Sequence, residues 1–249
     1  MITDPYFYAA AIPAVLLMGL SKSGFGSGFG SLAVPIMALS VTVPQAAAIF
    51  IPILLVMDLL GLAAFRKHFQ WPLLKFLVPL GLLGTALGTL TFKQLSPAAV
   101  SVIVGVLTLL FLAQRLYKAR RAGSQAPLPK AVGGVLAVVA GFTSFVAHAG
   151  GPPINAYVMG LRQPPLQFTA TMAVFFFVIN LSKWLPYSYL GLLSLENFST
   201  SLALLPLAPI GVWVGVRVAH RIRPELFYRV IELGMLLTGL KLVAEWRWL

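Results

Sequence analysis

The sequence contains no cysteine, and only 10% of its 249 residues are charged. The lack of cysteine excludes disulfides, thiolate metal sites and cysteine nucleophiles. A typical soluble domain is about 25% charged, so the scarcity of charge excludes an ordinary soluble enzyme and also a disordered chain. Hydrophobic residues make up 59% of the sequence, and apolar runs of about 15 to 25 residues are typical of a polytopic helical membrane protein.

Acidic residues are also scarce, with six Asp and Glu against eighteen Lys and Arg, for a net charge of +12. In a membrane protein such an excess is typical of cytoplasmic loops. No soluble segment carries a basic and aromatic stripe, so nucleic acid is not an expected partner. The three histidines, His68, His148 and His220, are far apart and have no metal-ligand spacing. We therefore predict neither a metal site nor a cofactor.

Ten apolar segments follow one another along the chain. They cover residues 6–20, 32–40, 44–65, 72–92, 97–115, 131–147, 154–161, 165–190, 199–220 and 224–245. Six are long enough to span a bilayer core of about 30 Å, two are marginal (6–20 and 131–147), and two are far too short (32–40 and 154–161). Each short segment follows a marginal one through a break rich in glycine or proline. The pattern predicts an all-α membrane protein whose two halves each begin with a broken or re-entrant helix pair.

A polar stretch separates the halves. From Arg115 to Lys130 it carries five positive charges and no negative one. We interpret residues 116–130 as a basic cytoplasmic linker between a first membrane repeat, 1–115, and a second, 131–249.

The two halves share a pattern of glycine and proline. A spacing of 127 residues relates Pro79 to Pro206, Gly84 to Gly211, Gly88 to Gly215 and Pro97 to Pro224. A spacing of 121 relates Gly30 to Gly151, and one of 122 relates Asp58 to Asn180. Counting five segments per half from a cytoplasmic linker inverts the second repeat. It also places loops 66–75 and 217–229 inside and both termini outside. Inverted repeats with discontinuous helices are typical of secondary transporters.

The first break alternates glycine with other residues from Gly24 to Gly30. Such backbone leaves the helix and exposes N–H groups, and at membrane depth it is tolerated where it lines a cavity. We expect Ser31 to cap the following helix, whose N-terminus favours an anion. The candidate substrate-binding residues here are Lys22, Ser23, Gly26, Ser27, Gly28, Gly30 and Ser31. The alternative is close helix packing through small residues; a nucleotide P-loop is excluded because no Gly-Lys-Ser/Thr follows.

The second break begins after Thr143 and Ser144. Two glycines are expected to end one helix and two prolines to begin the next, because proline is tolerated in a first turn. The candidate substrate-binding residues are His148, Gly150, Gly151, Pro152 and Asn155. An ionisable side chain in a membrane break indicates a site, although a lone histidine is also compatible with a structural role.

Three further polar residues lie in apolar segments and are candidates for coupling. Asp58 is either a carrier of a coupling proton or a counter-charge for Lys22 or another cation, and Asn180 is its counterpart in the second half. Lys183 either contacts substrate or snorkels toward the outer membrane surface.

The sequence resembles the TauE/SafE family of membrane permeases, also called sulfite exporters. The resemblance rests on GFGSGFGSLAVP (Gly24–Pro35), HAGGPPINAY (His148–Tyr157), the basic central linker and the total length. It implies transport of small sulfur-containing anions such as sulfite or organosulfonates.

Together these features predict a multi-pass secondary transporter of a small anion in the cytoplasmic membrane, working by alternating access, and not an enzyme. Two alternatives stay open: a channel-like conductor of anions or protons, and a membrane-embedded interaction or assembly protein. The expected partners are the anionic substrate and the lipid bilayer. The sequence leaves open whether the chain forms a homo-oligomer.

Overall fold

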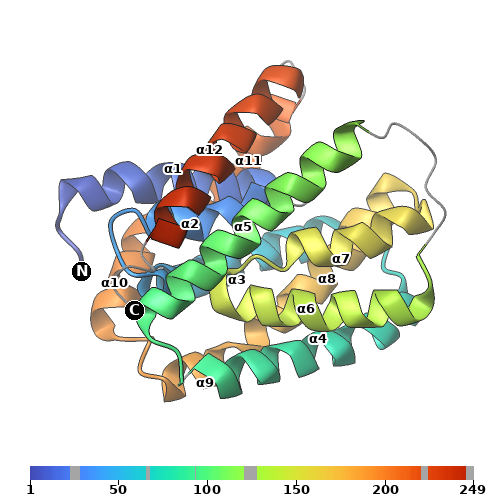
Figure 1. Cartoon of the computed structure of the whole chain (residues 1–249), viewed down its shortest axis with the longest axis horizontal. Helices are drawn as coiled ribbons and strands as arrows, with labels where there is room; N and C mark the ends of the chain where they lie inside the picture. The colour runs from blue at the N-terminus through green and yellow to red at the C-terminus, as the bar shows by residue number, and fades with distance from the viewer. Residues whose placement is uncertain (23–28, 66–67, 93, 121–127, 220–223, 245–249) are drawn as a thin grey trace.

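The computed structural model describes residues 1–22, 29–65, 68–92, 94–120, 128–219 and 224–244, and within these ranges all regular structure is helical. The helices follow in the order α1 (Pro5–Lys22), η1 (Phe29–Leu32), α2 (Ala33–Met37), α3 (Val43–Phe65), α4 (Trp71–Phe92), α5 (Pro97–Arg120), α6 (Lys130–Ala147), α7 (Gly151–Val158), η2 (Met159–Leu161), α8 (Pro165–Ser182), α9 (Trp184–Tyr189), α10 (Leu195–Leu204), α11 (Leu207–Ala219) and α12 (Pro224–Ala244). Each apolar segment of the sequence has a helical counterpart, so the all-α prediction is confirmed (Figure 1).

Several helices have the length and hydropathy of a membrane span. Among the described residues these are Val43–Ala63, Trp71–Phe92, Lys130–Ala147 and Leu166–Tyr189. A fifth span results if α10 and α11, which meet at an angle of 44°, are taken together. Pro206 stands at this bend, where its missing N–H and its ring interrupt a continuous helix.

The second half departs from the predicted segments at two places. The predicted segment 199–220 begins earlier, because Ser194 caps α10 by accepting a hydrogen bond from the N–H of Asn197 at 3.2 Å. The predicted segment 165–190 is divided at Lys183 into α8 and α9.

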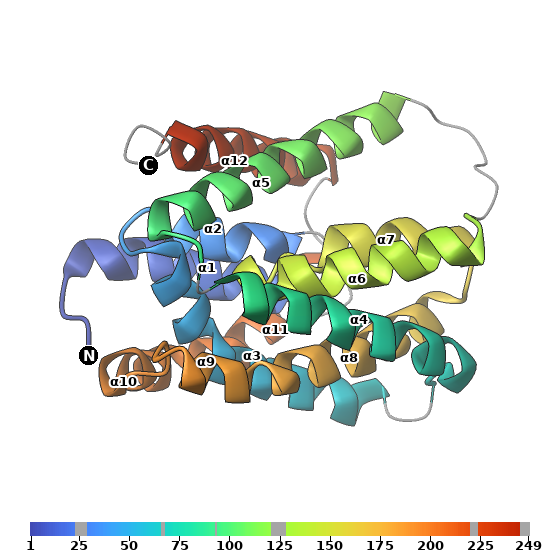
Figure 2. The ribbon, with the colours of Figure 1, turned by 60° about the horizontal axis from the view of Figure 1, so that its bottom comes forward.

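The helices pack in four principal pairs: α4 along α6, α1 along α11, α3 along α8 and α5 along α12 (Figures 1 and 2). Glycines permit the closest of these approaches. A Cβ added at Gly84 would collide with the carbonyl oxygen of Val138 on α6, and one added at Gly19 would lie 2.7 Å from the carbonyl carbon of Gly211 on α11. Small residues at crossings are the usual means of packing helices in membranes.

Most of the buried apolar side chains form two clusters, and each cluster joins helices from both halves of the sequence. The first cluster consists mainly of residues from α1, α2 and α3, with Leu204 of α10, Ala208 of α11, the last turn of α6 and a few residues of α5, α9 and α12. The second contains residues of α4, α6, α7 and α8. We call α1, α2, α3, α10 and α11 lobe one, and α4, α6, α7 and α8 lobe two.

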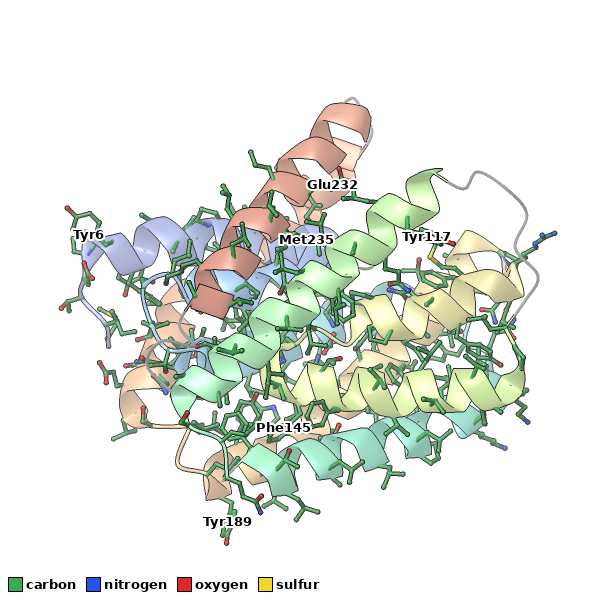
Figure 3. All side chains as sticks on the ribbon, in the orientation of Figure 1. Tyr6, Tyr117, Phe145, Tyr189, Glu232 and Met235 are labelled. Carbon is green, nitrogen blue, oxygen red and sulfur yellow. The ribbon has the colours of Figure 1, made fainter. Side chains whose placement is uncertain are left out.

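The ends of the helices sort to two ends of the molecule. The beginning of α1 and the end of α12 lie at one end, while the α3–α4 and α5–α6 connections begin and end at the other (Figures 1 and 2). Tyr6 and Tyr189 are 82% and 73% exposed and point outward near the first end, whereas Phe145 is fully buried (Figure 3).

Candidate functional site

The two helix breaks lie next to each other in the fold. The turn η1 of the first break contacts α7 of the second. A cavity of about 90 Å³ lies at their junction, with walls from α1, η1, α3, α6, α7 and α8. This volume holds several water molecules or one small polyatomic anion.

The described lining of the cavity has a polar and an apolar side. The polar side chains include Ser21, Lys22, Ser31, Asp58, Ser144 and Asn180, together with His148. The apolar side includes Met18, Leu54, Met57, Met172 and Phe176. The Nζ of Lys22 lies 5.1 Å from the centroid of the Phe176 ring, within range of a cation–π contact.

The second break turns at His148. This residue has φ 52° and ψ 26°, and the chain closes behind it with hydrogen bonds from the N–H of His148 to the oxygen of Ser144 and from the N–H of Ala149 to the oxygen of Thr143. The bond from His148 to Ser144 is the 5→1 bond of an αL helix cap, in which glycine is the usual left-handed residue. The expectation that the two glycines end α6 is therefore wrong, because a histidine takes the left-handed position.

The glycines and prolines of this break have other roles. A Cβ on Gly150 would lie 2.6 Å from the carbonyl oxygen of Ala140, so this position requires glycine for close approach. Gly151 lines the cavity at the start of α7. Pro152 and Pro153 follow, and because proline has no N–H, this helix start offers fewer free backbone donors than an ordinary one.

The first break is described from Phe29 onward. Gly30 packs against the end of α1: a Cβ added there would lie 2.9 Å from the sulfur of Met18 and 3.1 Å from the Oγ of Ser21. Ser31 lies inside η1, while α2 has Leu32 as its N-cap and no side-chain cap hydrogen bond. The prediction that Ser31 caps the following helix is therefore wrong, because a 3-10 turn precedes α2.

The charged side chains of the site form a chain of contacts between the lobes. Lys22 Nζ pairs with Asp58 Oδ1 at 2.5 Å, and the Nδ2 of Asn180 donates to Asp58 Oδ2 at 2.6 Å. Asp58 is 1% exposed, so its charge is matched inside the protein. The contact expected of Asp58 as a counter-charge for Lys22 is present, and its role in coupling stays a prediction.

Lys183 is completely buried. Its Nζ lies 2.7 Å from the backbone oxygen and 2.8 Å from the Oγ of Ser144, 2.8 Å from the Oδ1 of Asn180, and 2.9 Å from the Nδ1 of His148. A snorkelling lysine extends its ammonium group to water. The snorkelling interpretation is therefore wrong, because the Lys183 amine is held inside the protein by side chains of α6 and α8.

His148 is held on both sides of its ring. Its Nε2 lies 2.9 Å from the carbonyl oxygen of Ala47 on α3. The ring of Tyr187 stacks beside it with centroids 6.4 Å apart, and the Tyr187 hydroxyl donates to the oxygen of Phe145 at 2.6 Å. His148 thus connects lobe two to α3, and it also lines the cavity.

The structure brings most of the described candidate residues together. The cavity is lined by Lys22, Gly30, Ser31, Asp58, His148, Gly151 and Asn180. Lys183 lies behind this lining. Gly150 and Pro152 belong to the second break but do not line the cavity. Asn155 is 3% exposed, and both polar atoms of its amide lack a hydrogen-bond partner among the described residues. Ser23, Gly26, Ser27 and Gly28 lie outside the described residues.

Sequence reasoning missed part of the lining. Ser21 and Ser144 are hydroxyl residues in the last turn of the helix before each break, a pattern that was visible in the sequence. Thr169 and the apolar wall formed by Met57, Met172 and Phe176 carry no such signal. These residues sit in continuous apolar helices, and only the tertiary fold brings them to the site.

Apolar helices of spanning length, arranged around two broken helices and a buried charged cavity, define a polytopic membrane protein of the permease class. The chain belongs to the family described as Sulfite exporter TauE/SafE, whose family model matches residues 11–242. This family membership implies a membrane transporter of sulfur-containing anions. Comparison with curated proteins and with solved structures found no match.

Proposed function

We propose that the protein is a secondary transporter of the cytoplasmic membrane that moves sulfite or a related sulfur oxyanion or organosulfonate by alternating access. The substrate binds in the cavity between the two breaks. Membership in the sulfite exporter family supports the class of substrate. The charge and the position of the cavity support the binding site and the mechanism.

The observation that carries the proposal is the balance of charge around the cavity. Lys22 and Lys183 bring two amines into the network, and Asp58 is its only carboxylate among the described residues. When both amines are protonated, the network has one positive charge in excess. An unmatched charge inside a membrane protein is unfavourable by several kcal/mol, so a bound monovalent anion stabilises the loaded cavity.

The lining supplies the remaining interactions of a small oxyanion. The hydroxyls of Ser21, Ser31 and Ser144 can donate hydrogen bonds to anion oxygens, and Lys22 is 18% exposed on the cavity side of its ion pair. The methionine and phenylalanine wall offers soft apolar contact to sulfur or to a short alkyl group. The cavity volume of about 90 Å³ favours a small anion over a bulky one.

The inverted repeat is supported by the contacts between the halves. The pairing of α1 with α11 becomes the pairing of α6 with α4 when the halves are exchanged, and α3–α8 and α5–α12 map onto themselves. The same holds for individual residues. Gly84 approaches Val138, and Gly211 approaches Leu16, which precedes Val138 by 122 residues.

Polar contacts follow the same exchange. Asp58 bonds Asn180, its own counterpart 122 residues later, as expected near a two-fold axis. Gln45 Nε2 donates to Asn197 Oδ1 at 3.2 Å, and Gln70 Nε2 donates to Gln167 Oε1 at 2.6 Å. Gln167 follows Gln45 by 122 residues and Asn197 follows Gln70 by 127, the two spacings of the predicted repeat.

The moving bodies in this proposal are the lobes and not the halves of the sequence. α4 belongs to lobe two and α10–α11 to lobe one, so each repeat contributes helices to both lobes. The cavity lies at the α3–α8 junction between them. Rocking of one lobe against the other then opens the cavity to either side of the membrane in turn.

The test is a thermal-stability screen of purified protein against sulfite, thiosulfate, ethanesulfonate and acetate. A ligand that binds only the folded protein raises its stability. We expect a sulfur anion to raise the unfolding temperature of the wild type more than acetate does. The Lys22→Met/Asp58→Asn double variant, which leaves the net charge of the network unchanged but removes the cavity amine, should lose this response. A wild type that no sulfur anion stabilises would argue for a membrane-embedded assembly protein instead.

A further inference from the structure

Lys183 and His148 contact each other behind the lining of the cavity, with Nζ 2.9 Å from Nδ1. Lys183 is fully buried and does not line the cavity, whereas His148 and Ser144 do. The amine is therefore one contact away from a bound anion. Its environment is fixed by Ser144, Asn180 and His148.

Donors and acceptors at this contact limit the number of protons that it can hold. The carbonyl of Ala47 can only accept, so His148 Nε2, 2.9 Å away, carries a hydrogen. The contact between Nδ1 and Lys183 Nζ at 2.9 Å needs one donor and one acceptor. A doubly protonated imidazole cannot face an ammonium group here, so the pair has a total charge of either zero or +1.

The surrounding groups satisfy both of these states. A protonated Lys183 has three N–H groups for the Ser144 oxygens, Asn180 Oδ1 and His148 Nδ1. A neutral amine has two N–H groups and one lone pair, and the Ser144 hydroxyl, 2.8 Å away, can donate to that lone pair. In the neutral state the two N–H groups face Asn180 Oδ1 and His148 Nδ1, while the backbone oxygen of Ser144 keeps its hydrogen bond from the N–H of His148.

Ser144 also connects the pair to the cavity. Its side chain lines the cavity and contacts Lys183 Nζ. The hydroxyl can pass a proton to the amine: its O–H bond breaks as a new N–H bond forms on Nζ, while a cavity hydronium ion supplies a replacement proton to Oγ. Release follows the same steps in reverse, and no group other than water is needed to donate or accept the proton.

The charges that face the pair connect proton binding to anion binding. Among the described residues they are Lys22 on α1 and Asp58 on α3, which are paired with each other, and Tyr187 on α9, whose ring stacks on His148. None of these groups supplies a free negative charge to balance a proton on the pair. An anion in the cavity does so, and by linkage each ligand raises the affinity for the other.

We propose that Lys183 and His148 form a proton-binding site and that the transporter carries one proton together with each monovalent anion. This inference rests on the proposed function, because it needs an anion in the cavity. Lys183 does not touch the anion and acts through Ser144 and His148. The substrate and the proton then cross the membrane as a pair with no net charge.

The test measures anion and proton movement in the same proteoliposomes, with methanesulfonate and ethanesulfonate as probes because both are monovalent and neither takes up a proton near neutral pH. An interior pH dye follows protons, and labelled anion follows transport. With an acidic exterior, we expect accumulation of about tenfold per pH unit, the limit for one proton per monovalent anion. Interior acidification should match anion entry one for one. This wild-type measurement does not depend on the folding of any variant.

Variants assign the proton to the pair. Lys183→Met should raise the anion concentration that half-saturates exchange, and the exchange that remains should lose the accumulation driven by the pH gradient. Ser144→Ala should slow that accumulation. Lys75→Met, which removes an exposed lysine of α4, should behave as the wild type. Anion exchange without proton movement in the wild type would overturn the inference and leave the proposed function intact. Absence of exchange for both anions would overturn both.

Discussion

At the scale of single residues, the site depends on matching charges in an apolar environment. Lys22 and Asp58 lie 36 positions apart in the sequence, on α1 and α3, and neither helix offers another charge to replace the partner. Removing one member leaves the other buried without compensation, which is much less favourable than removing both.

Asp58→Asn should therefore destabilise the protein by about 2 kcal/mol, less than the full effect of a broken buried pair because Lys22 is 18% exposed. The Lys22→Met/Asp58→Asn double variant should recover at least half of this loss. Denaturant titration in mild detergent measures the free energy of unfolding of the wild type, both single variants and the double variant, which completes the double-mutant cycle. Additive losses from the two single variants would contradict a stabilising pair.

Several residue roles were predictable from the sequence, and others were not. The sequence singled out Asp58, Lys183 and His148 as ionisable residues of apolar segments, and in the structure all three are buried with polar partners. The partners themselves were only partly visible. Snorkelling of Lys183 was a reasonable expectation from its position along the segment, but the hydrogen bonds to Ser144 and Asn180 arise from the packing of α6 against α8.

At the scale of the helices, hydrophobic runs located the apolar segments, because a span of the bilayer needs a continuous apolar run. They did not predict the start of α10 or the division of α8 from α9 at Lys183. Local signals at the breaks were less reliable. Ser31 has the chemistry of a cap but lies in a 3-10 turn, and His148 occupies a left-handed position where the sequence favoured glycine. Both differences follow from tertiary contacts at the cavity, which propensity rules do not include.

The crossings α1–α11 and α4–α6 should depend on glycine. We expect Gly84→Ala and Gly19→Ala each to lower stability by about 2 kcal/mol, because the added methyl group meets the backbone of the partner helix. Gly134→Ala is the matched control, since its Cβ would meet only the flexible end of Leu80 at 3.2 Å. Thermal unfolding of the purified variants measures the difference. Equal stability of the three variants would mean that these crossings tolerate a methyl group.

At the scale of the whole molecule, both ends of the described chain lie on the same side, which agrees with an even number of membrane crossings in total. The start of α1 and the end of α12 share one end of the molecule, opposite the α5–α6 connection (Figure 2). The basic linker supplies the orientation that the fold alone lacks.

The linker should therefore face the cytoplasm and the termini the outside. In intact cells, an impermeant thiol reagent should label Tyr6→Cys, at an 82% exposed position near the start of α1, and should leave Ser124→Cys unlabelled until the membrane is permeabilised. The absence of native cysteine makes the background low. Labelling of Ser124→Cys in intact cells would reverse the assigned orientation.

The two lobes should move against each other during transport. A Cβ added at Gly61 on α3 would lie 3.7 Å from the Cβ of Ala173 on α8, a spacing that suits a disulfide. Gly61→Cys/Ala173→Cys should therefore oxidise readily and lose transport, and a reductant should restore it. The single-cysteine variants show the effect of each substitution on the cavity. Full transport by the oxidised double variant would exclude movement at the α3–α8 junction.

The central claim is that one cavity between the lobes carries a sulfur anion by alternating access, and counterflow tests it most directly. Proteoliposomes are loaded with unlabelled thiosulfate, and entry of labelled thiosulfate is followed at increasing external concentration. The account predicts saturable entry that internal thiosulfate accelerates several-fold over empty vesicles, and loss of this acceleration in the Lys22→Met/Asp58→Asn variant. Entry that rises linearly with concentration and is indifferent to internal thiosulfate would contradict the account and identify a channel-like conductor.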